Sequence, residues 1–432
     1  MTFRHIAAVL TCGAALACSA SASAEVRVWE KDPAKGDDDV PVLSVDVFGW
    51  VQPRFTWEQH DTREPKYQWE PAPGFRIRRA RLGTRAELTS WASANLELDL
   101  ATDQARPLDG YLTLTPMSEL RVTAGQFRVP FSRQNLVSSR ARQLPDPAYF
   151  VTPKFMIERD QGAMIWGELL DGRLNYYAAA FNGAGAGQQE NIDPYFLIAA
   201  RLEVAPLGKL PGFESDVRPV AQRIAPLVGM GIGAMNNCVQ TDDLRRTYLG
   251  ADVAAFWRGF SLYAEVFQRT DKTMQAKSSL TGLSGDSILG VCRRRAKAGD
   301  EPAKMNQEVV KVVGYNLQAG AFLPLRWFED HLELVARHQS LDPNTHVSQP
   351  DSFDLTATNP TQGYQTIELG VNWFLGGLRP KAPRAGAAHN AKIQATYEIR
   401  NETKKCMAGQ TEPGCTGYIN NNVLIVQATG GF

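Results

Sequence analysis

Apolar and polar residues alternate at period two along much of the chain. Residues 96–100 read Leu-Glu-Leu-Asp-Leu, and residues 367–373 read Ile-Glu-Leu-Gly-Val-Asn-Trp. This period is typical of a β-strand with one apolar and one polar face. We expect about sixteen such strands, near residues 42–57, 74–88, 93–101, 108–115, 119–129, 161–169, 173–182, 196–206, 226–236, 245–256, 259–269, 310–323, 329–340, 363–375, 390–401 and 420–432.

Most of these segments are longer than a typical soluble strand and close to the ~9–11 residues that cross a bilayer at a tilt. Their connections alternate between short turns, such as 89–91, 170–172 and 257–259, and long loops, such as 130–160 and 270–309. Alternating short turns and long loops are typical of outer-membrane barrels. The pattern therefore predicts an all-β fold, an antiparallel membrane-spanning β-barrel of about 16 strands.

Large aromatic residues follow the same alternation. Trp91, Trp257, Trp327, Trp373 and Phe374 all fall beside predicted short turns. We expect them to form an aromatic belt at one membrane interface.

The first residues resemble an export signal. Arg4 and His5 precede an apolar run, and Ala22-Ser23-Ala24 fits a cleavage site. A lipoprotein signal that ends at Cys18 is the alternative. We expect a signal peptide over residues 1–24, a periplasmic acidic segment over residues 25–40 and the barrel domain over residues 41–432.

Four cysteines follow the signal, all in predicted long loops: Cys238, Cys292, Cys406 and Cys415. An even number outside the cytoplasm favours disulfide bonds, although spacing alone permits three connectivities. We expect a Cys406–Cys415 bond within one loop and a Cys238–Cys292 bond between neighbouring loops. The chain has no C-x-x-C or H-E-x-x-H motif, so we expect no zinc site and no cofactor.

The charges balance overall, with 46 Lys and Arg against 46 Asp and Glu. This balance gives no general argument for binding nucleic acid. Arginine, however, outnumbers lysine by 32 to 14. A guanidinium stays charged and binds oxyanions with two parallel hydrogen bonds, so the arginines are candidates for anion binding.

Arginines concentrate in the strand predicted around residues 75–88, which reads F-R-I-R-R-A-R-L-G-T-R-A-E-L. Its alternation shifts by one residue near Arg79, which indicates a β-bulge. Each arginine that faces lipid at mid-depth would cost ~2–4 kcal/mol, so we expect Arg76, Arg78, Arg81 and Arg85 to face the lumen. About sixteen strands leave that lumen open as a channel.

The connection over residues 130–160 is both apolar and basic. It begins with Pro130-Phe131 and carries too many apolar residues for a loop in water. We expect it to fold inward and form a constriction, where its cations meet the arginines of the strand. These cations are Arg133, Arg140, Arg142, Lys154 and Arg159.

Several motifs add a resemblance to a known family. Residues 120–132 (LRVTAGQFRVPFS), 158–162 (ERDQG), 172–176 (GRLNY) and 181–183 (FNG), together with residues 75–88, are similar to the phosphate-selective porin O and P family. The similarity covers most of the chain after the signal and is densest over residues 74–183.

The resemblance implies a trimeric barrel of sixteen strands, in which an arginine ladder and inward loops guide phosphate or polyphosphate. It assigns the arginine-rich strand to residues 75–88. It makes five further residues candidates for constriction cations: Arg121, Arg128, Arg133, Arg140 and Arg142.

We therefore expect a porin of the outer membrane of a Gram-negative-type cell, with an anion-preferring channel. Its expected partners are small anions, phosphate among them, outer-membrane lipid and lipopolysaccharide, and two further copies of the chain, but no nucleic acid. The alternatives are a general non-selective porin, and a structural or adhesive barrel with a blocked lumen. We do not expect an enzyme, because the histidines are scattered and no G-x-S-x-G motif is present.

Overall fold

The computed structural model of the protein describes residues 26–30, 43–59, 73–188, 190–191, 195–218, 220–239, 244–273, 275–276, 293–294, 309–324, 331–342, 362–375, 391–404, 418–420 and 422–431. The expected signal peptide over residues 1–24 lies outside the described residues, as do Cys292, Trp327, Cys406 and Cys415.

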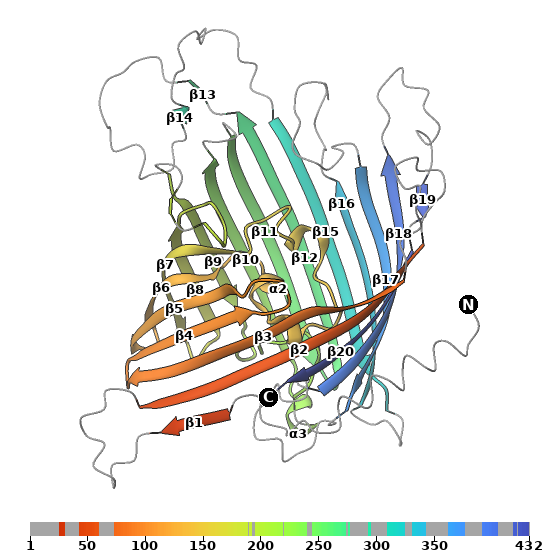
Figure 1. Cartoon of the computed structure of the whole chain (residues 1–432), viewed down its shortest axis with the longest axis horizontal. Coiled ribbons are helices and arrows are strands. Elements are labelled where there is room, and N and C mark those ends of the chain that lie inside the picture. The colour runs from red at the N-terminus through yellow and green to blue at the C-terminus, as the bar shows by residue number, and fades with distance from the viewer. Residues whose placement is uncertain are drawn as a thin grey trace.

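The main sheet has eighteen strands, of which β1 and β19 are short additions and the other sixteen form a closed antiparallel barrel (Figure 1). Each barrel strand pairs with the next in the chain, and β2 closes the ring by pairing with β20. The barrel strands are β2 (Ser44–Glu58), β3 (Gly74–Thr89), β4 (Ala92–Asp99), β5 (Arg106–Met117), β6 (Leu120–Arg128), β7 (Arg159–Leu169), β8 (Leu174–Phe181), β9 (Leu197–Val204), β10 (Leu227–Val239), β11 (Leu244–Trp257), β12 (Phe260–Thr273), β15 (Val309–Phe322), β16 (Leu332–Asp342), β17 (Gln362–Phe374), β18 (Ala391–Lys404) and β20 (Val423–Gly431).

All sixteen strands expected from alternation are confirmed. The short strands were not expected: β1 (Val26–Glu30) pairs with β2, and β19 (Tyr418–Asn420) pairs with β18. Two further short strands, β13 (Gln275–Ala276) and β14 (Arg293–Arg294), form a separate parallel pair.

Two of the expected short turns have a specific backbone geometry. Leu170 and Asp171 between β7 and β8 have φ of 53° and 56°, and Arg258 and Gly259 between β11 and β12 have φ of 51° and 82°. Arg258 and Gly259 are the only residues between the paired Trp257 and Phe260, and positive φ at both is the pattern of a two-residue hairpin turn whose twist matches that of the strands. The β7–β8 connection is longer, with four residues between the paired Leu169 and Leu174 and positive φ also at Gly172.

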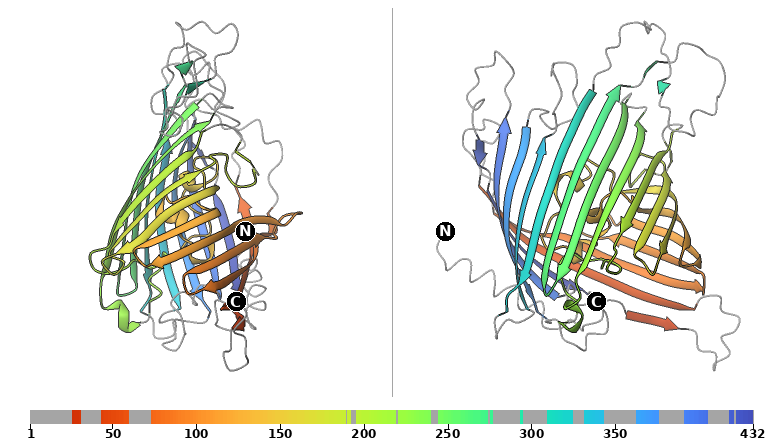
Figure 2. Two further views of the ribbon diagram at one scale, coloured as in Figure 1. Left: turned by 90° about the vertical axis from the view of Figure 1, so that its left-hand side faces the viewer. Right: turned by 180° about the vertical axis from the view of Figure 1, so that it is seen from behind.

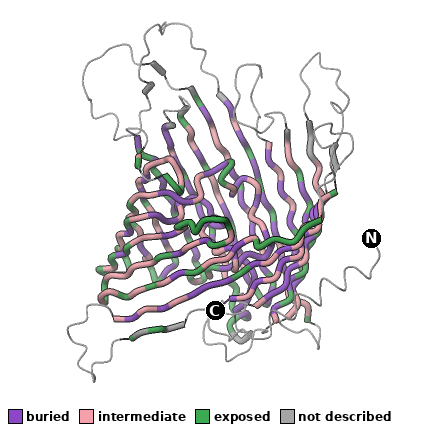
Figure 3. Tube along the Cα trace, in the orientation of Figure 1, coloured by how far each residue is buried: buried purple, intermediate pink, exposed green. Residues whose placement is uncertain are grey.

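Burial alternates along the strands, as Figure 3 shows. In β9, Leu197 and Ala199 are buried, whereas the side chains of Ile198 and Leu202 are exposed. Large apolar residues such as Leu249 and Leu369 are likewise exposed on the outside of the barrel, as lipid requires. Among the described residues, none of the helices is long and apolar enough to cross a membrane.

Three of the tryptophans expected in the aromatic belt are exposed, and their place at a membrane interface stays a prediction. Trp91 in the turn between β3 and β4 is 53% exposed, and Trp257 and Trp373 near the ends of β11 and β17 are 50% and 40% exposed. The expectation for Phe374 is wrong, because its side chain is fully buried against Phe322, with ring centroids 5.4 Å apart. As the neighbour of Trp373 on one strand, Phe374 points to the opposite face.

The expected bulge in β3 is also confirmed. Arg79 pairs with Gln52 of β2, whereas the next pair joins Ile77 to Pro53, so that Arg78 has no partner in the register. Pro53 has no N–H to donate, and proline within a sheet is typical of such interruptions.

The connection between β6 and β7 contains the helix α2 (Arg133–Leu136) and the 3-10 turns η3 (Ser139–Ala141) and η4 (Tyr149–Val151). In Figure 1 and in the turned views of Figure 2 this connection lies within the ring of strands. Its apolar side chains are buried against the wall: Phe150 stacks on Phe267 of β12, with ring centroids 5.2 Å apart and planes at 13°. We call residues 129–158 the inner segment.

A second connection packs against the inner segment. Residues 205–226, between β9 and β10, include the helix α3 (Val220–Arg223). The Glu214 carboxylate accepts hydrogen bonds from Gln134 Nε2 at 3.0 Å and from the backbone N–H of Gln143 at 2.9 Å. Two connections therefore meet inside the barrel.

Candidate functional site

A cavity of about 370 Å³ lies between the wall formed by β2–β7 and the part of the inner segment around residues 136–140. We call it the wall cavity. Its lining consists of Phe48, Trp50, Arg85, Asn95, Glu97, Asp109, Tyr111, Thr113, Thr123, Phe127, Arg128, Leu136, Ser138, Arg140, Met164 and Trp166.

Three arginines line the wall cavity from separate elements: Arg85 from β3, Arg128 from β6 and Arg140 from η3. Arg128 Nη1 donates to the backbone carbonyls of Asn135 and Val137, which fixes its guanidinium to the inner segment. The Arg140 guanidinium lies 5.2 Å from the centroid of a Trp50 ring, which is a cation–π distance.

Two carboxylates also line the wall cavity, and both already bind other arginines. Glu97 accepts a hydrogen bond from Arg81 Nη1 at 2.8 Å. Asp109 accepts one from Arg159 Nε at 2.8 Å. Three guanidiniums and two carboxylates therefore line the wall cavity, and both carboxylates form ion pairs with arginines outside the lining.

The inner segment is fixed to the barrel wall beside the wall cavity through Asp146. Arg54 of β2 donates to the Asp146 carboxylate from Nη1 at 2.6 Å and from Nη2 at 3.1 Å. Guanidinium nitrogens of Arg78 and Arg79 lie 3.6 and 3.8 Å from the same carboxylate. Burial alone would raise the pKa of Asp146, but the charge and hydrogen bond of Arg54 and the charges of Arg78 and Arg79 outweigh it and hold the pKa well below its usual value.

On the opposite side, the inner segment is bonded to the wall through Gln143. Its side chain and backbone carbonyl form hydrogen bonds of 2.6–2.9 Å with consecutive barrel strands β12, β15, β16, β17 and β18. The partners are Ser261, Gln318, Glu333, Asn372 and Gln394. Side chains thus fill the space between the inner segment and this wall, whereas the wall cavity lies on the other side.

The structure divides the expected anion-binding residues into groups. Arg85, Arg128 and Arg140 meet at the wall cavity. Arg81, Arg121 and Arg159 bind carboxylates, and Arg121 donates to Glu168 at 2.9 Å.

The other expected residues lie outside the wall cavity lining. Arg133 donates to the Pro211 carbonyl at 2.5 Å, and Arg142 is buried and donates to the Gln134 carbonyl at 3.3 Å. Arg78 lies near Asp146. Arg76 is exposed, and it pairs with Arg54 of β2 in the register. The Lys154 amine lies 5.7 Å from the Phe155 ring centroid. Of the expected residues, Arg85, Arg128 and Arg140 thus form one cluster at the wall cavity, and the whole set does not line it as a continuous ladder. The role of each expected residue in anion binding stays a prediction.

Sequence reasoning missed the residues that hold the site together. Arg54 and Gln52 share the polar face of β2 with Trp50, so the alternation of that strand could have indicated them. Asp146 has no such signal, because it lies in irregular structure and its partners are distant in sequence.

Cys238 takes part in a disulfide bond. Its expected partner Cys292 lies outside the described residues, as do Cys406 and Cys415. The Cys238–Cys292 and Cys406–Cys415 pairings therefore stay predictions. Within the described part of the chain, no group of three or more His, Cys, Asp or Glu residues is arranged to hold a metal ion.

Comparisons with known proteins agree with this geometry. The family model of phosphate-selective porin O and P matches residues 51–209, which confirms the resemblance over that segment. A comparison with curated proteins gives no match.

Solved structures share the fold at low sequence identity. OmpF of Salmonella typhi, in complex with daunomycin, has a TM-score of 0.52 at 10% identity, covering 94% of this chain and 100% of that chain. The in-vitro folded OmpT of Vibrio cholerae has a TM-score of 0.51 at 10% identity, covering 90% and 97%. At this identity the likeness establishes the barrel alone.

Proposed function

We propose that this outer-membrane porin, which matches the phosphate-selective porin O and P family over residues 51–209, passes small anions in preference to cations through the wall cavity. The observation that carries the proposal is the convergence of Arg85, Arg128 and Arg140 from three separate elements on one cavity, whose two carboxylates bind other arginines. Walls of low dielectric focus such a charge and raise the local concentration of anions.

The inner segment acts in this proposal as the constriction. Its bonds to the walls through Asp146 and Gln143 support a fixed position, and Arg128 and Arg140 bring its cationic surface to the passage. A fixed constriction with several weak anion sites permits selective conduction, because an ion can both enter and leave.

Phosphate is the finer part of the proposal and rests on the family description. The ion pairs of Arg81, Arg121 and Arg159 favour a broader anion channel, since these guanidiniums already bind carboxylates. Adding millimolar phosphate while the channel carries chloride current distinguishes a phosphate-selective channel from a general anion channel. A block of the current indicates a phosphate site, and an unchanged current indicates a general anion channel.

We also propose a homotrimer. The supporting observations are the apolar outer face of the barrel and the description of one OmpT structure of Vibrio cholerae as a trimer form. Cross-linking of the detergent-solubilised protein tests this proposal, with a monomer as the opposing result.

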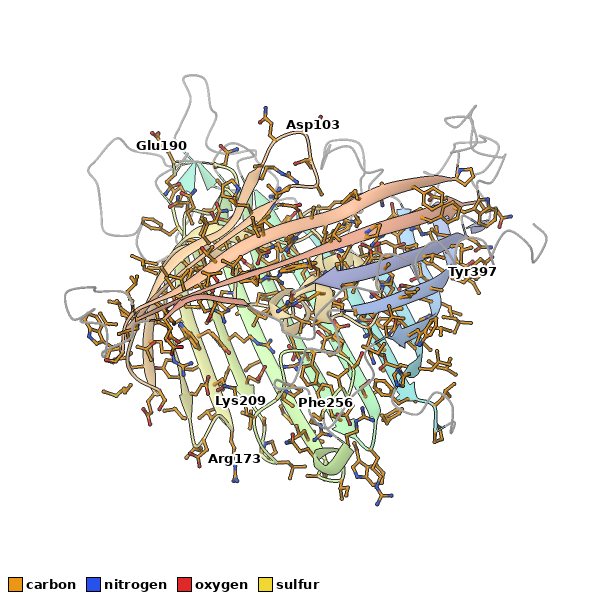
Figure 4. All side chains as sticks on the ribbon, turned by 60° about the horizontal axis from the view of Figure 1, so that its bottom comes forward. Asp103, Arg173, Glu190, Lys209, Phe256 and Tyr397 are labelled. Atoms are coloured by element: carbon orange, nitrogen blue, oxygen red, sulfur yellow. The ribbon has the colours of Figure 1, made fainter. Side chains whose placement is uncertain are left out.

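The reversal potential in a potassium chloride gradient across a planar bilayer tests the anion preference. We expect chloride preference in the natural protein and a marked loss of it in the double variant Arg85→Gln and Arg140→Gln. Arg173→Gln is the matched control, because Arg173 is exposed beside the turn after β7 (Figure 4). Cation preference in the natural protein would contradict the proposal. Equal permeability to both ions would favour the non-selective porin, and no channel at all would favour the blocked barrel.

A further inference from the structure

The wall cavity is aromatic as well as basic. Phe48 and Trp50 come from β2, Tyr111 from β5, Phe127 from β6 and Trp166 from β7. Phe48 and Trp50 have ring centroids 6.2 Å apart with planes at 18°, and Tyr111 meets Phe127 edge to face at 6.0 Å. Rings thus line the wall cavity across the same strands that supply Arg85 and Arg128.

This lining suits one class of anion better than phosphate. A strongly hydrated oxyanion gains little from aromatic surface, whereas a planar apolar body buries its faces against such rings. We propose that the wall cavity binds aromatic monocarboxylates, an inference that rests on the proposed anion preference and names a substrate class for the same site.

The polar groups of the lining fit the carboxylate of such a ligand. Arg85, Arg128 and Arg140 bring three guanidiniums to the lining, of which Arg128 also donates to two backbone carbonyls of the inner segment. A guanidinium can bind a carboxylate with two parallel hydrogen bonds. Thr113 and Thr123 add hydroxyl groups that are bonded to each other at 2.9 Å. The ligand therefore meets charge at one end and rings along its body.

Glu97 and Asp109 limit the ligand to a single carboxylate. Both line the wall cavity beside the rings, so a second carboxylate on the ligand would lie near like charges. Their ion pairs with Arg81 and Arg159 reduce this repulsion without removing the carboxylates from the lining. Repulsion of this kind weakens the binding of ligands with two carboxylates, and it does not strengthen the binding of ligands with one.

The volume is compatible with passage as well as binding. Ligand pockets are typically ~300–1,000 Å³, and the wall cavity of about 370 Å³ lies at the low end of that range. It is large enough for one small ring acid. A site open at the constriction holds such a ligand weakly enough for release.

The test uses the full-length protein in planar bilayers carrying chloride current, with benzoate added on one side. We expect benzoate to reduce the current at a concentration about three- to tenfold lower than cyclohexanecarboxylate, which has the same charge but no aromatic faces. Inorganic phosphate should reduce the current less than benzoate does. Equal effects of the two ring acids, or a stronger effect of phosphate, would overturn the inference.

Variants locate the site. Trp166→Leu and, independently, Tyr111→Leu should remove most of the difference between benzoate and cyclohexanecarboxylate, because leucine keeps apolar volume without an aromatic face. Trp91→Leu on the outer belt is the matched control and should leave that difference unchanged. Two variants are used so that one which fails to fold does not decide the result. If folded Trp166 and Tyr111 variants keep the full difference, the site is wrongly placed.

The reversal potential of the same channels separates this inference from the proposed function. Chloride preference without discrimination between the ring acids contradicts the inference alone. If the natural protein shows no chloride preference, both the proposed function and this inference are contradicted.

Discussion

Arg54 on β2 and Asp146 in the inner segment form a two-pronged ion pair, with Arg54 Nη1 and Nη2 donating to the two carboxylate oxygens at 2.6 and 3.1 Å. The Arg54 side chain is almost completely buried, and its Nε and Nη2 also donate to Gln427 Oε1 of β20. The pair joins the inner segment to the seam where β2 and β20 close the barrel. It fixes the position of the residues that border the wall cavity.

The Arg54–Asp146 pair should survive mild acid. Because the folded pKa of Asp146 is lowered, its contribution to stability is present above the pKa of an unfolded aspartate and is lost only as the pH falls through the lower, folded value. Asp146→Asn should therefore lower the unfolding temperature by the same amount at pH 7 and at about pH 4, where an ordinary aspartate is half protonated. Thermal unfolding of both proteins at the two pH values measures this. Below about pH 3 the difference should shrink, and a difference that stays constant down to about pH 2 would contradict the lowered pKa, because equal folded and unfolded values make the contribution independent of pH.

Asp252 on β11 should be essential to the stability of the barrel. Its carboxylate binds the fully buried Arg201 of β9 at 2.6 Å across the intervening strand β10. Gly231 makes this crossing possible, because a Cβ there would lie 2.2 Å from the Arg201 guanidinium. Removing one partner of a buried pair typically costs ~3–5 kcal/mol, so Asp252→Asn should lower the free energy of unfolding by about that amount. Urea unfolding in lipid vesicles measures it.

The matched control for that substitution is Asp171→Asn in the exposed turn after β7. Asparagine tolerates the positive φ of this position, so the change should stay within about 0.5 kcal/mol. Equal stability losses at Asp171 and Asp252 would contradict the importance of the Arg201 pair.

Gly125 on β6 should tolerate no side chain. Its φ is +132°, and a Cβ would lie 2.2 Å from the Gly110 carbonyl oxygen and 2.7 Å from Tyr111 Cα. Gly125→Ala should cost about 1–3 kcal/mol from backbone strain alone and should displace Tyr111 from the wall cavity. Gly430→Ala is the control, because a Cβ there meets no atom within 4 Å. Unfolding measurements on the two variants compare the costs, and equal values would contradict the expectation.

The alternation of the sequence was sufficient to predict all sixteen barrel strands, because each strand has one face toward lipid and one toward the interior. It also predicted the bulge beside Arg79, which shifts the register of β3. The inward orientation of Phe374 was missed, since aromatic residues serve both at the interface and in the interior.

The charge pairing could not be predicted in the same way. Arg81 binds Glu97 of the neighbouring strand β4, and Arg159 of β7 binds Asp109 of β5 across the intervening strand β6. These contacts depend on a register that alternation leaves open. Asp146 reaches Arg54 only because the inner segment crosses the barrel. The sequence therefore identified the arginines, but not which of them border the wall cavity.

The modification of a cysteine in the wall cavity tests most directly whether anions pass there. Ser138→Cys places a thiol in the lining, whereas Ser261→Cys places one in the buried contact between Gln143 and β12 and serves as the control. We predict that a sulfonate-bearing methanethiosulfonate reagent reduces the current of the Ser138 variant, and does so faster than a trimethylammonium-bearing reagent, while the control current stays unchanged. An unchanged current in the Ser138 variant, or faster modification by the cationic reagent, would contradict an anion passage along this wall.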